Sequence, residues 1–204
     1  MSDRVKSLVY IPVLVFIYLV ILPYQSRAEF LQFGAAYPIM FINGSNDFNH
    51  SGSNVTLKDD GQLDGYTGLL GINYLFIGVD KFSRGFRFDT DEQEKIKLKY
   101  ENISIGLFLN GKIWHMGLAL GFGESSLECT KICDEDFTKP EIVKGDLISF
   151  QFGNILTKYL AFYIELKNST FDSVRLYSSS DDNDYYEFTN PSGMLVTVGL
   201  FIDF

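Results

Sequence analysis

The feature that most constrains the fold of this chain is an alternation of apolar side chains with small or polar ones. Between Gly193 and Phe204 every even position is apolar, whereas the odd positions are mixed. Successive side chains on a strand point to opposite faces, so this segment predicts a strand with one continuous apolar face. After residue 28, no stretch shows a convincing apolar period of 3.6, which would indicate a helix.

The same period of two recurs along the chain in six further segments. They are residues 29–42, 64–73, 96–109, 113–125, 145–154 and 158–171. The segment 76–88 fits least well, because its apolar residues change from odd to even positions after residue 79. A bulge near Asp80 and Lys81 would bring both sets to one face. The chain therefore contains eight predicted strands.

The connections between these strands alternate between long and short. Residues 43–63, 89–95, 124–144 and 172–190 are polar and predict loops, three of them long. Tight turns are expected near residues 73–75, 110–112 and 154–157, and Asn110-Gly111 is a strong two-residue hairpin signal. An even number of strands, with long loops at one end and short turns at the other, is typical of an outer-membrane barrel. The predicted fold class is an all-β, eight-stranded antiparallel up-and-down transmembrane β-barrel.

The two faces of the strands differ in a way that orients them. Large apolar side chains occupy one face, with about four outward residues per strand covering roughly 18–20 Å of bilayer. The other face is small and polar, as the narrow lumen of eight strands requires. There we expect a network of Glu165, Lys167, Tyr163 and Gln151, with His115 near one end. The network is either a plug that stiffens the barrel or part of a narrow, gated water path. Tyr66, Tyr100 and Trp114 are expected in aromatic girdles.

The amino terminus has the organisation of an export signal. Arg4 and Lys6 precede an uninterrupted apolar run over residues 8–22, and small residues stand at a cleavage position after residue 28. The alternative is a retained anchor, but about 20 apolar residues are needed to span a bilayer. We expect residues 1–28 to be removed and residues 29–204 to form the barrel domain. Export permits a disulfide between Cys129 and Cys133, although their spacing makes a small ring.

The net charge and the types of polar residue in the chain argue against several functions. A net charge of −9 argues against nucleic-acid binding, which needs a basic surface. The acidic run over residues 181–184 could bind Ca²⁺ or a cationic partner, but it lacks the ligand spacing of a calcium loop. His50 and Ser51 are adjacent in a loop, and a nucleophile and base adjacent in sequence seldom face one another. We expect no cofactor, no metal site and no catalytic residues.

These features together resemble a known family. The export signal, the eight-strand pattern and a terminal strand ending in Phe204 are similar to the small bacterial outer-membrane barrels of the OmpA membrane-domain, OmpX and Ail type. The resemblance implies that Phe204, Ile202, Leu200 and Val198 are read by the outer-membrane assembly machinery. It also implies a monomer in the outer membrane of a Gram-negative bacterium, with a structural role or an adhesive one towards a host or surface ligand through its loops.

Two other classes of function stay open at the sequence level. One is a lipid-modifying enzyme or a small gated pore, although His115 is followed by Met116-Gly117 and not by the His-x-Ser signature of lipid A deacylases. The other is a soluble exported barrel of lipocalin type. One lipid contact is also predicted. If no bulge intervenes, Lys97 and Lys99 point outward just above the hydrocarbon, level with lipopolysaccharide phosphates.

Overall fold

The computed structural model describes residues 31–43, 48–88, 95–111, 113–131 and 137–204. The predicted signal segment, residues 1–28, lies outside these ranges. Every regular element in the described ranges is a β-strand. None of the described residues forms a helix of the length and hydropathy that a membrane-crossing helix requires.

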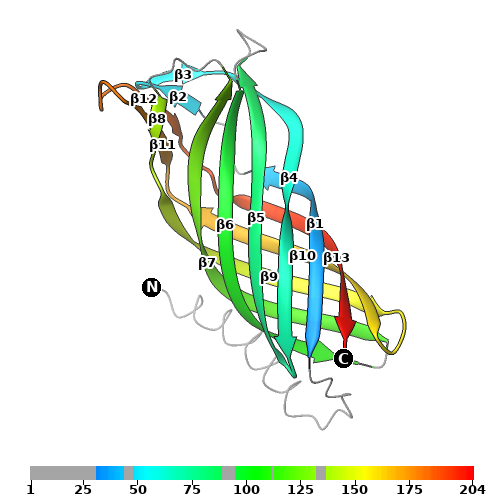
Figure 1. Cartoon of the computed structure of the whole chain (residues 1–204). Helices are drawn as coiled ribbons and strands as arrows, with labels where there is room; N and C mark the ends of the chain where they lie inside the picture. The colour runs from blue at the N-terminus through cyan, green and yellow to red at the C-terminus, as the bar shows by residue number, and fades with distance from the viewer. Residues whose placement is uncertain (1–30, 44–47, 89–94, 112, 132–136) are drawn as a thin grey trace, which may run out of the picture.

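Eight long strands form a closed antiparallel barrel (Figure 1), which confirms the predicted fold class. They are β1 (Gln32–Asn43), β4 (Leu57–Ile72), β5 (Leu75–Phe88), β6 (Lys95–Asn110), β7 (Trp114–Lys131), β9 (Val143–Ile155), β10 (Leu160–Phe171) and β13 (Gly193–Asp203). Each strand pairs with the next barrel strand along the chain, and β1 pairs with β13 to close the barrel. The short turns lie at one end, where the chain also ends after β13.

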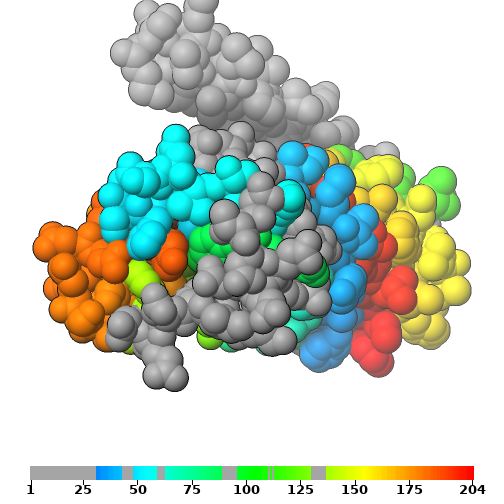
Figure 2. Space-filling view, turned by 90° about the horizontal axis from the view of Figure 1, so that it is seen from above, coloured from blue at the N-terminus to red at the C-terminus, as the bar shows by residue number. Residues whose placement is uncertain are grey.

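The long connections are not irregular loops, as the sequence suggested, but extend the fold beyond the barrel. Five short strands form a second sheet in the order β3-β2-β12-β11-β8, which we call the loop sheet. These strands are β2 (Phe48–His50), β3 (Ser53–Val55), β8 (Phe137–Pro140), β11 (Val174–Ser178) and β12 (Tyr185–Phe188). Seen from above, the β2–β3 segment lies beside the β11–β12 segment (Figure 2). The β2–β3 turn consists of Ser51 and Gly52, whose φ angles of 47° and 83° fit a type I′ hairpin.

The alternation of residue types in the sequence determines which side chains lie on the outside of the barrel wall and which lie inside it. On β13, Leu200 and Ile202 are exposed on the outside, whereas Leu195 and Phe201 are buried inside. The same holds on β7, where Leu118 and Leu120 point outward. The apolar face of each strand therefore lies on the outside of the barrel, as a membrane barrel requires.

The register of β5 differs from the sequence prediction. It pairs with β6 without interruption from Leu75 to Arg87, so no bulge occurs near Asp80. Ile77 and Val79 point outward, and the later phenylalanines of β5 are buried inside. The irregularity lies in β4, between Asp59 and Leu63. The prediction failed because the upper lumen contains an apolar core, so both faces of β5 carry large apolar side chains.

That core fills the upper barrel, at the end nearer the loop sheet, and continues into the sheet. Its buried members come from the upper ends of the barrel strands and from β2, β8, β11 and β12. Tyr100 is one of them and is therefore not part of an aromatic girdle. Its ring stacks on Phe82 at 4.5 Å between centroids, and its hydroxyl donates to the Pro191 carbonyl at 2.7 Å. Tyr66, in contrast, is exposed on the outside, as predicted.

The barrel wall has one seam of short pairing, between β1 and β4. These strands pair only over Gln32–Ala36. Pro38 lies two residues beyond Ala36 and has no N–H to donate to a neighbouring strand. The register of β1 with β13 also shifts between Pro38 and Met40. Above the paired region, the Tyr37 hydroxyl donates to the Leu63 carbonyl across the seam at 3.4 Å.

Candidate functional site

The barrel lumen brings together most of the polar residues predicted to lie there. At its centre is Lys167 of β10, whose side chain is buried. Its ammonium contacts the carboxylate of Asp80, and it lies 3.0 Å from Glu165 Oε2. It also donates to Thr67 Oγ1 at 3.3 Å. One ammonium is thus shared by two carboxylates, in a place where an unpaired charge would be strongly disfavoured.

Glu165 links this centre to the next strands of the barrel. It accepts a hydrogen bond from Gln151 Nε2 at 3.0 Å and one from the Thr197 hydroxyl at 3.4 Å. Gln151 Oε1 in turn lies 3.4 Å from His115 Nε2. Tyr163 is buried nearby, and its hydroxyl has no hydrogen-bond partner among the described residues. The network joins side chains from β4, β5, β7, β9, β10 and β13.

Three members of the network were missed from the sequence. They are Asp80, Thr67 and Thr197. Asp80 was missed because the presumed bulge left its direction open. The two threonines gave no signal, because a threonine on a polar strand face is common in any barrel. If it had been known that the even-numbered residues of β5 point inward, Asp80 would have been predicted to lie in the lumen.

Layers of aromatic rings lie on both sides of the network. On the turn side, Phe76 stacks on Phe108 at 4.2 Å, and His115 lies 4.3 Å from Phe201. On the side of the loop sheet, Tyr100 meets Phe82, Phe41 and Phe171. Along β5 the inward residues run in order from Phe76 through Asp80 to Phe82. In the described part of the lumen, aromatic rings therefore lie on both sides of the polar network.

A second cluster lies on the outward face of the loop sheet. Arg175 Nε donates to Glu187 Oε1 at 2.9 Å, and its guanidinium lies 5.2 Å from the centre of the Tyr185 ring. The rings of Tyr177 and Tyr185 are 5.7 Å apart. Hydrogen bonds with Tyr177 and with Glu187 raise the pKa of Arg175 above its usual value. We call Arg175, Tyr177, Tyr185 and Glu187 the aromatic platform.

The inward face of the loop sheet explains why the platform is fixed. Val174, Leu176 and Phe188 alternate with the platform residues and are buried. Phe188 contacts Phe48 of β2 and Phe86 of β5. The sheet is thereby anchored to the barrel core.

His50 and Ser51 meet an acidic residue distant in sequence, Asp184. His50 Nε2 and Ser51 Oγ each lie 2.8 Å from Asp184 Oδ1. The carboxylate thus sits between the serine and the histidine, and the serine donates to the carboxylate instead of to the imidazole. In a catalytic triad the histidine lies between the other two and removes the proton of the serine. The cluster joins the β2–β3 hairpin to the β11–β12 hairpin.

The acidic run at residues 181–184 is used within the protein. Asp181 accepts hydrogen bonds from the backbone and side chain of Asn183, at 2.8 and 3.1 Å, and so closes the β11–β12 turn. Asp182 pairs with Lys139 at 3.3 Å. Among the described residues, no group of three or more His, Cys, Asp or Glu side chains could hold a metal ion.

The remaining predicted site residues lie on the outside or near the loops. Val198, Leu200 and Ile202 face outward on β13, and Phe204 packs edge-on against Phe33 at 6.1 Å. Lys97 and Lys99 share the outward parity of β6, and no bulge turns them inward. Cys129 takes part in a disulfide. Its predicted partner, Cys133, lies outside the described residues.

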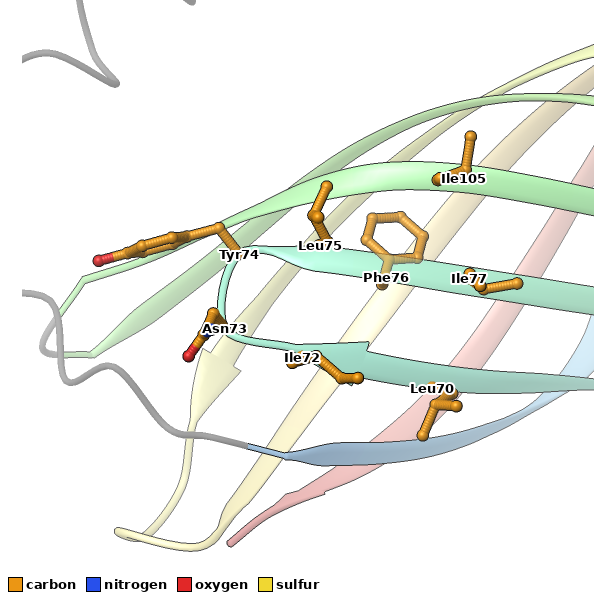
Figure 3. A pocket seen from close by; sticks show the side chains of 8 residues that line it. All are labelled: Leu70, Ile72, Asn73, Tyr74, Leu75, Phe76, Ile77 and Ile105. Carbon is orange, nitrogen blue, oxygen red and sulfur yellow. The ribbon is translucent and has the colours of Figure 1, made fainter.

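The outer surface also carries an apolar groove near the β4–β5 turn (Figure 3). It is lined by Leu70, Ile72, Asn73, Tyr74, Leu75, Phe76, Ile77 and Ile105. Only Asn73 and Tyr74 offer polar groups, and both stand at the turn. The groove contains no acid, base or nucleophile, and it continues the apolar outer face.

These observations define an eight-stranded antiparallel barrel with an apolar exterior, a polar network between aromatic rings in its lumen, and a loop sheet at one end. No protein family model matches the chain, and no curated protein matches its sequence. Among solved structures, it is similar to the outer-membrane protein OprG of Pseudomonas aeruginosa, with a TM-score of 0.60 and 10% identity, covering 89% of this chain and 99% of that one.

A second similar structure is Ail, the attachment invasion locus protein of Yersinia pestis, in complex with the heparin analogue sucrose octasulfate. Its TM-score is 0.51 at 12% identity, and the match covers 85% of this chain and 96% of Ail. At such low identity the likeness shows the fold alone. The chain has the fold of the small eight-stranded outer-membrane barrels, which confirms the resemblance drawn from the sequence.

Proposed function

We propose that this protein resides in the bacterial outer membrane and binds a macromolecular partner outside the cell through its loop sheet. The placement is supported by the continuous apolar exterior and by the fold shared with OprG and Ail. The long connections and the loop sheet lie at the end opposite the short turns, which is the extracellular end in barrels of this class.

The aromatic platform is the observation that carries the proposal. Tyrosine and arginine, together with tryptophan, are enriched at the positions from which protein interfaces gain most of their binding energy. Here two tyrosines and one arginine are already held by ring contacts and hydrogen bonds. A surface fixed before binding loses little conformational entropy when a partner docks.

The structure gives less support to the other functions considered. A pore needs a continuous water path, whereas buried rings and an ion-paired network lie in the described part of the lumen. An enzyme needs an activated nucleophile, and the cluster of Ser51, His50 and Asp184 has the wrong order of contacts for a catalytic triad. Ail was crystallised with a polysulfated ligand. The acidic run beside the platform disfavours such a ligand for this protein, because like charges would meet.

The proposal is tested by attachment of cells that display the full chain. A Gram-negative host expressing the protein is applied to immobilised extracellular-matrix proteins and to cultured epithelial cells. We expect attachment above that of the empty host. The double substitution Tyr177→Ala and Tyr185→Ala should abolish the increase.

The matched control replaces two exposed tyrosines at the opposite end of the barrel, Tyr74→Ala and Tyr159→Ala. It should attach like the parent protein. Altered migration on gels before and after boiling verifies that each variant is folded. Equal attachment by the platform variant and its parent would overturn the proposal.

A further inference from the structure

The polar network in the lumen has an excess of negative charge. It contains the carboxylates of Asp80 and Glu165 but a single ammonium, that of Lys167, and each of these side chains is at most 1% exposed. Burying a charge without a compensating charge of the opposite sign is costly. The network therefore requires one further positive charge, or the loss of one negative charge.

The excess charge lies on Asp80 rather than on Glu165. Both oxygens of Glu165 have donors, since Oε1 accepts from Gln151 at 3.0 Å and Oε2 lies 3.0 Å from the Lys167 ammonium. Asp80 Oδ1 also contacts Lys167. Asp80 Oδ2, in contrast, is buried and has no hydrogen-bond partner among the described residues. Buried polar atoms are nearly always hydrogen-bonded, so Asp80 Oδ2 is the atom that a further group contacts.

Two other buried polar side chains lie beside Asp80. Asn102 of β6 is its register partner, is 2% exposed, and has no hydrogen-bond partner for either amide atom in the described part of the chain. Inward side chains of register partners have Cβ atoms about 5 Å apart. Ser104 is the next inward residue of β6, is also 2% exposed, and its hydroxyl has no partner in the same ranges. We call Asp80, Asn102 and Ser104 the Asp80 cluster.

Two glycines give the cluster its shape. Gly78 is the inward residue of β5 before Asp80 and the register partner of Ser104. A Cβ atom at Gly78 would lie 2.7 Å from Ser104 Oγ, so this hydroxyl leans towards the strand that carries Asp80. Gly123 of β7 is the register partner of Asn102, and a Cβ atom there would overlap Asn102 Oδ1. Larger residues at these two positions would therefore displace the oxygens of the cluster.

Three kinds of group could meet Asp80 Oδ2, and they differ in charge. Water supplies hydrogen bonds but leaves the excess negative charge in place. A proton on Asp80 removes the charge but leaves the oxygens of Asn102 and Ser104 to be satisfied separately. A small cation does both, because carboxylate, amide and hydroxyl oxygens are ligands of hard cations. One positive charge balances the network, so the cation is monovalent.

Two other described residues could carry the compensating charge, but neither lies within hydrogen-bond distance of Asp80 Oδ2. Arg84 is the fourth residue after Asp80 on β5, about 13 Å along the strand. Its guanidinium lies 4.9 Å from the centre of the Phe86 ring, in the aromatic core. His115 reaches the network only through Gln151, whose Oε1 is 3.4 Å from His115 Nε2. A proton on His115 is the alternative that the experiment must separate.

We propose that the Asp80 cluster binds one monovalent cation of the size of sodium or potassium inside the barrel. Asp80 Oδ2, the Asn102 side-chain carbonyl and the Ser104 hydroxyl are its ligands, and water completes the coordination. This departs from the expectation, drawn from the sequence, that the chain has no metal site. It concerns the lumen alone and does not depend on the binding role proposed for the loop sheet.

The experiment measures the urea midpoint for unfolding of the full chain in phosphatidylcholine vesicles. Sodium chloride replaces N-methylglucamine chloride stepwise at constant ionic strength, because N-methylglucamine is too large to enter the cluster. A ligand that binds only the folded protein stabilises it increasingly as its concentration rises above the Kd. We therefore expect the midpoint to rise with the logarithm of the sodium concentration. The cation enters as the chain folds, so the test needs no path through the barrel.

Three variants locate the effect. Asp80→Asn removes the excess charge but keeps an oxygen for Lys167, and its midpoint should be independent of sodium. Asn102→Ala leaves the charge unchanged but removes a ligand, so about tenfold more sodium should be needed for the same shift. The matched control, Glu124→Gln, removes a carboxylate from an exposed position of β7. It should keep the sodium dependence of the parent protein.

The possible outcomes decide between the alternatives. Equal midpoints of the parent protein in sodium and in N-methylglucamine would overturn the cation site. If the midpoint then falls as the pH is raised, and His115→Gln abolishes that fall, a proton on His115 compensates the charge instead. Sodium dependence that persists unchanged in Asp80→Asn would also contradict the proposal, because sodium would act elsewhere. Should Asp80→Asn fail to fold, an unchanged sodium dependence in Asn102→Ala overturns the site.

Discussion

Lys167 is the residue on which the interior of the barrel depends most. It is buried between Asp80 and Glu165, and its contact with Asp80 links β10 to β5, which is distant in sequence. Replacing one partner of a buried ion pair leaves the other charge uncompensated, which typically costs about 3–5 kcal/mol. The substitution Lys167→Met should therefore lower the free energy of unfolding in lipid vesicles by about that amount, as measured by urea titration.

A compensated variant provides the control for that prediction. Lys167→Met combined with Asp80→Asn and Glu165→Gln removes all three charges and should recover most of the loss. If Lys167→Met alone left the unfolding midpoint unchanged, the network would not be a structural element of the lumen.

Asp184 is the residue that makes the cap sensitive to acid. Hydrogen bonds from Ser51 and then from His50 hold the pKa of the Asp184 carboxyl below its usual value. A depressed folded-state pKa gives stability that is complete above the unfolded pKa of about 3.9 and is lost as the pH falls through the folded one. Below about pH 4, the protection of the β2 and β3 amides against hydrogen exchange, taken relative to the intrinsic rate at the same pH, should fall. Asp184→Asn should show the faster exchange already at neutral pH, and an unchanged exchange rate in this variant would contradict the contact.

At the scale of elements, the loop sheet and the barrel share one apolar core. Phe188 of β12 contacts Phe86 of the barrel, so the sheet is anchored by buried rings. Large-to-small changes of a buried phenylalanine typically cost about 3–5 kcal/mol. Phe188→Ala should release the loop sheet and leave the barrel folded. Limited proteolysis should then cut between β11 and β12 while a heat-modifiable barrel remains, and protection equal to that of the parent would contradict the shared core.

The barrel strands could be predicted because apolar residues at every second position show directly which face of a strand meets lipid. The loop sheet could not, because β2, β8 and β12 are three or four residues long and too short for a pattern to be counted. The direction of the Asp80 side chain could not be predicted for a related reason. Large apolar side chains point inward in the upper half of β5, so apolar character no longer distinguishes the outside from the inside. Members of the lumen network could be predicted where polar and apolar residues alternate regularly along the strand, as around Glu165 and Gln151.

At the scale of the whole molecule, the protein is a closed barrel that carries a small second sheet at one end. The aromatic layers and the ion-paired network occupy the lumen between its ends. In planar bilayers the reconstituted protein should therefore give no stable single-channel conductance. Steady conductance, abolished by removing the protein, would show that the lumen carries water and would favour the pore.

Placement of the barrel in a membrane depends on which face of the strands meets lipid. Spin labels at Leu118, Ile164 and Val198, placed one at a time in the full chain in bilayers, test this directly, with Ser149 on the inner face for comparison. We expect oxygen to relax the first three labels strongly and a water-soluble nickel complex to relax them weakly, as lipid contact requires. Ready access of the nickel complex to those three positions, with lipid contact at Ser149 instead, would contradict it.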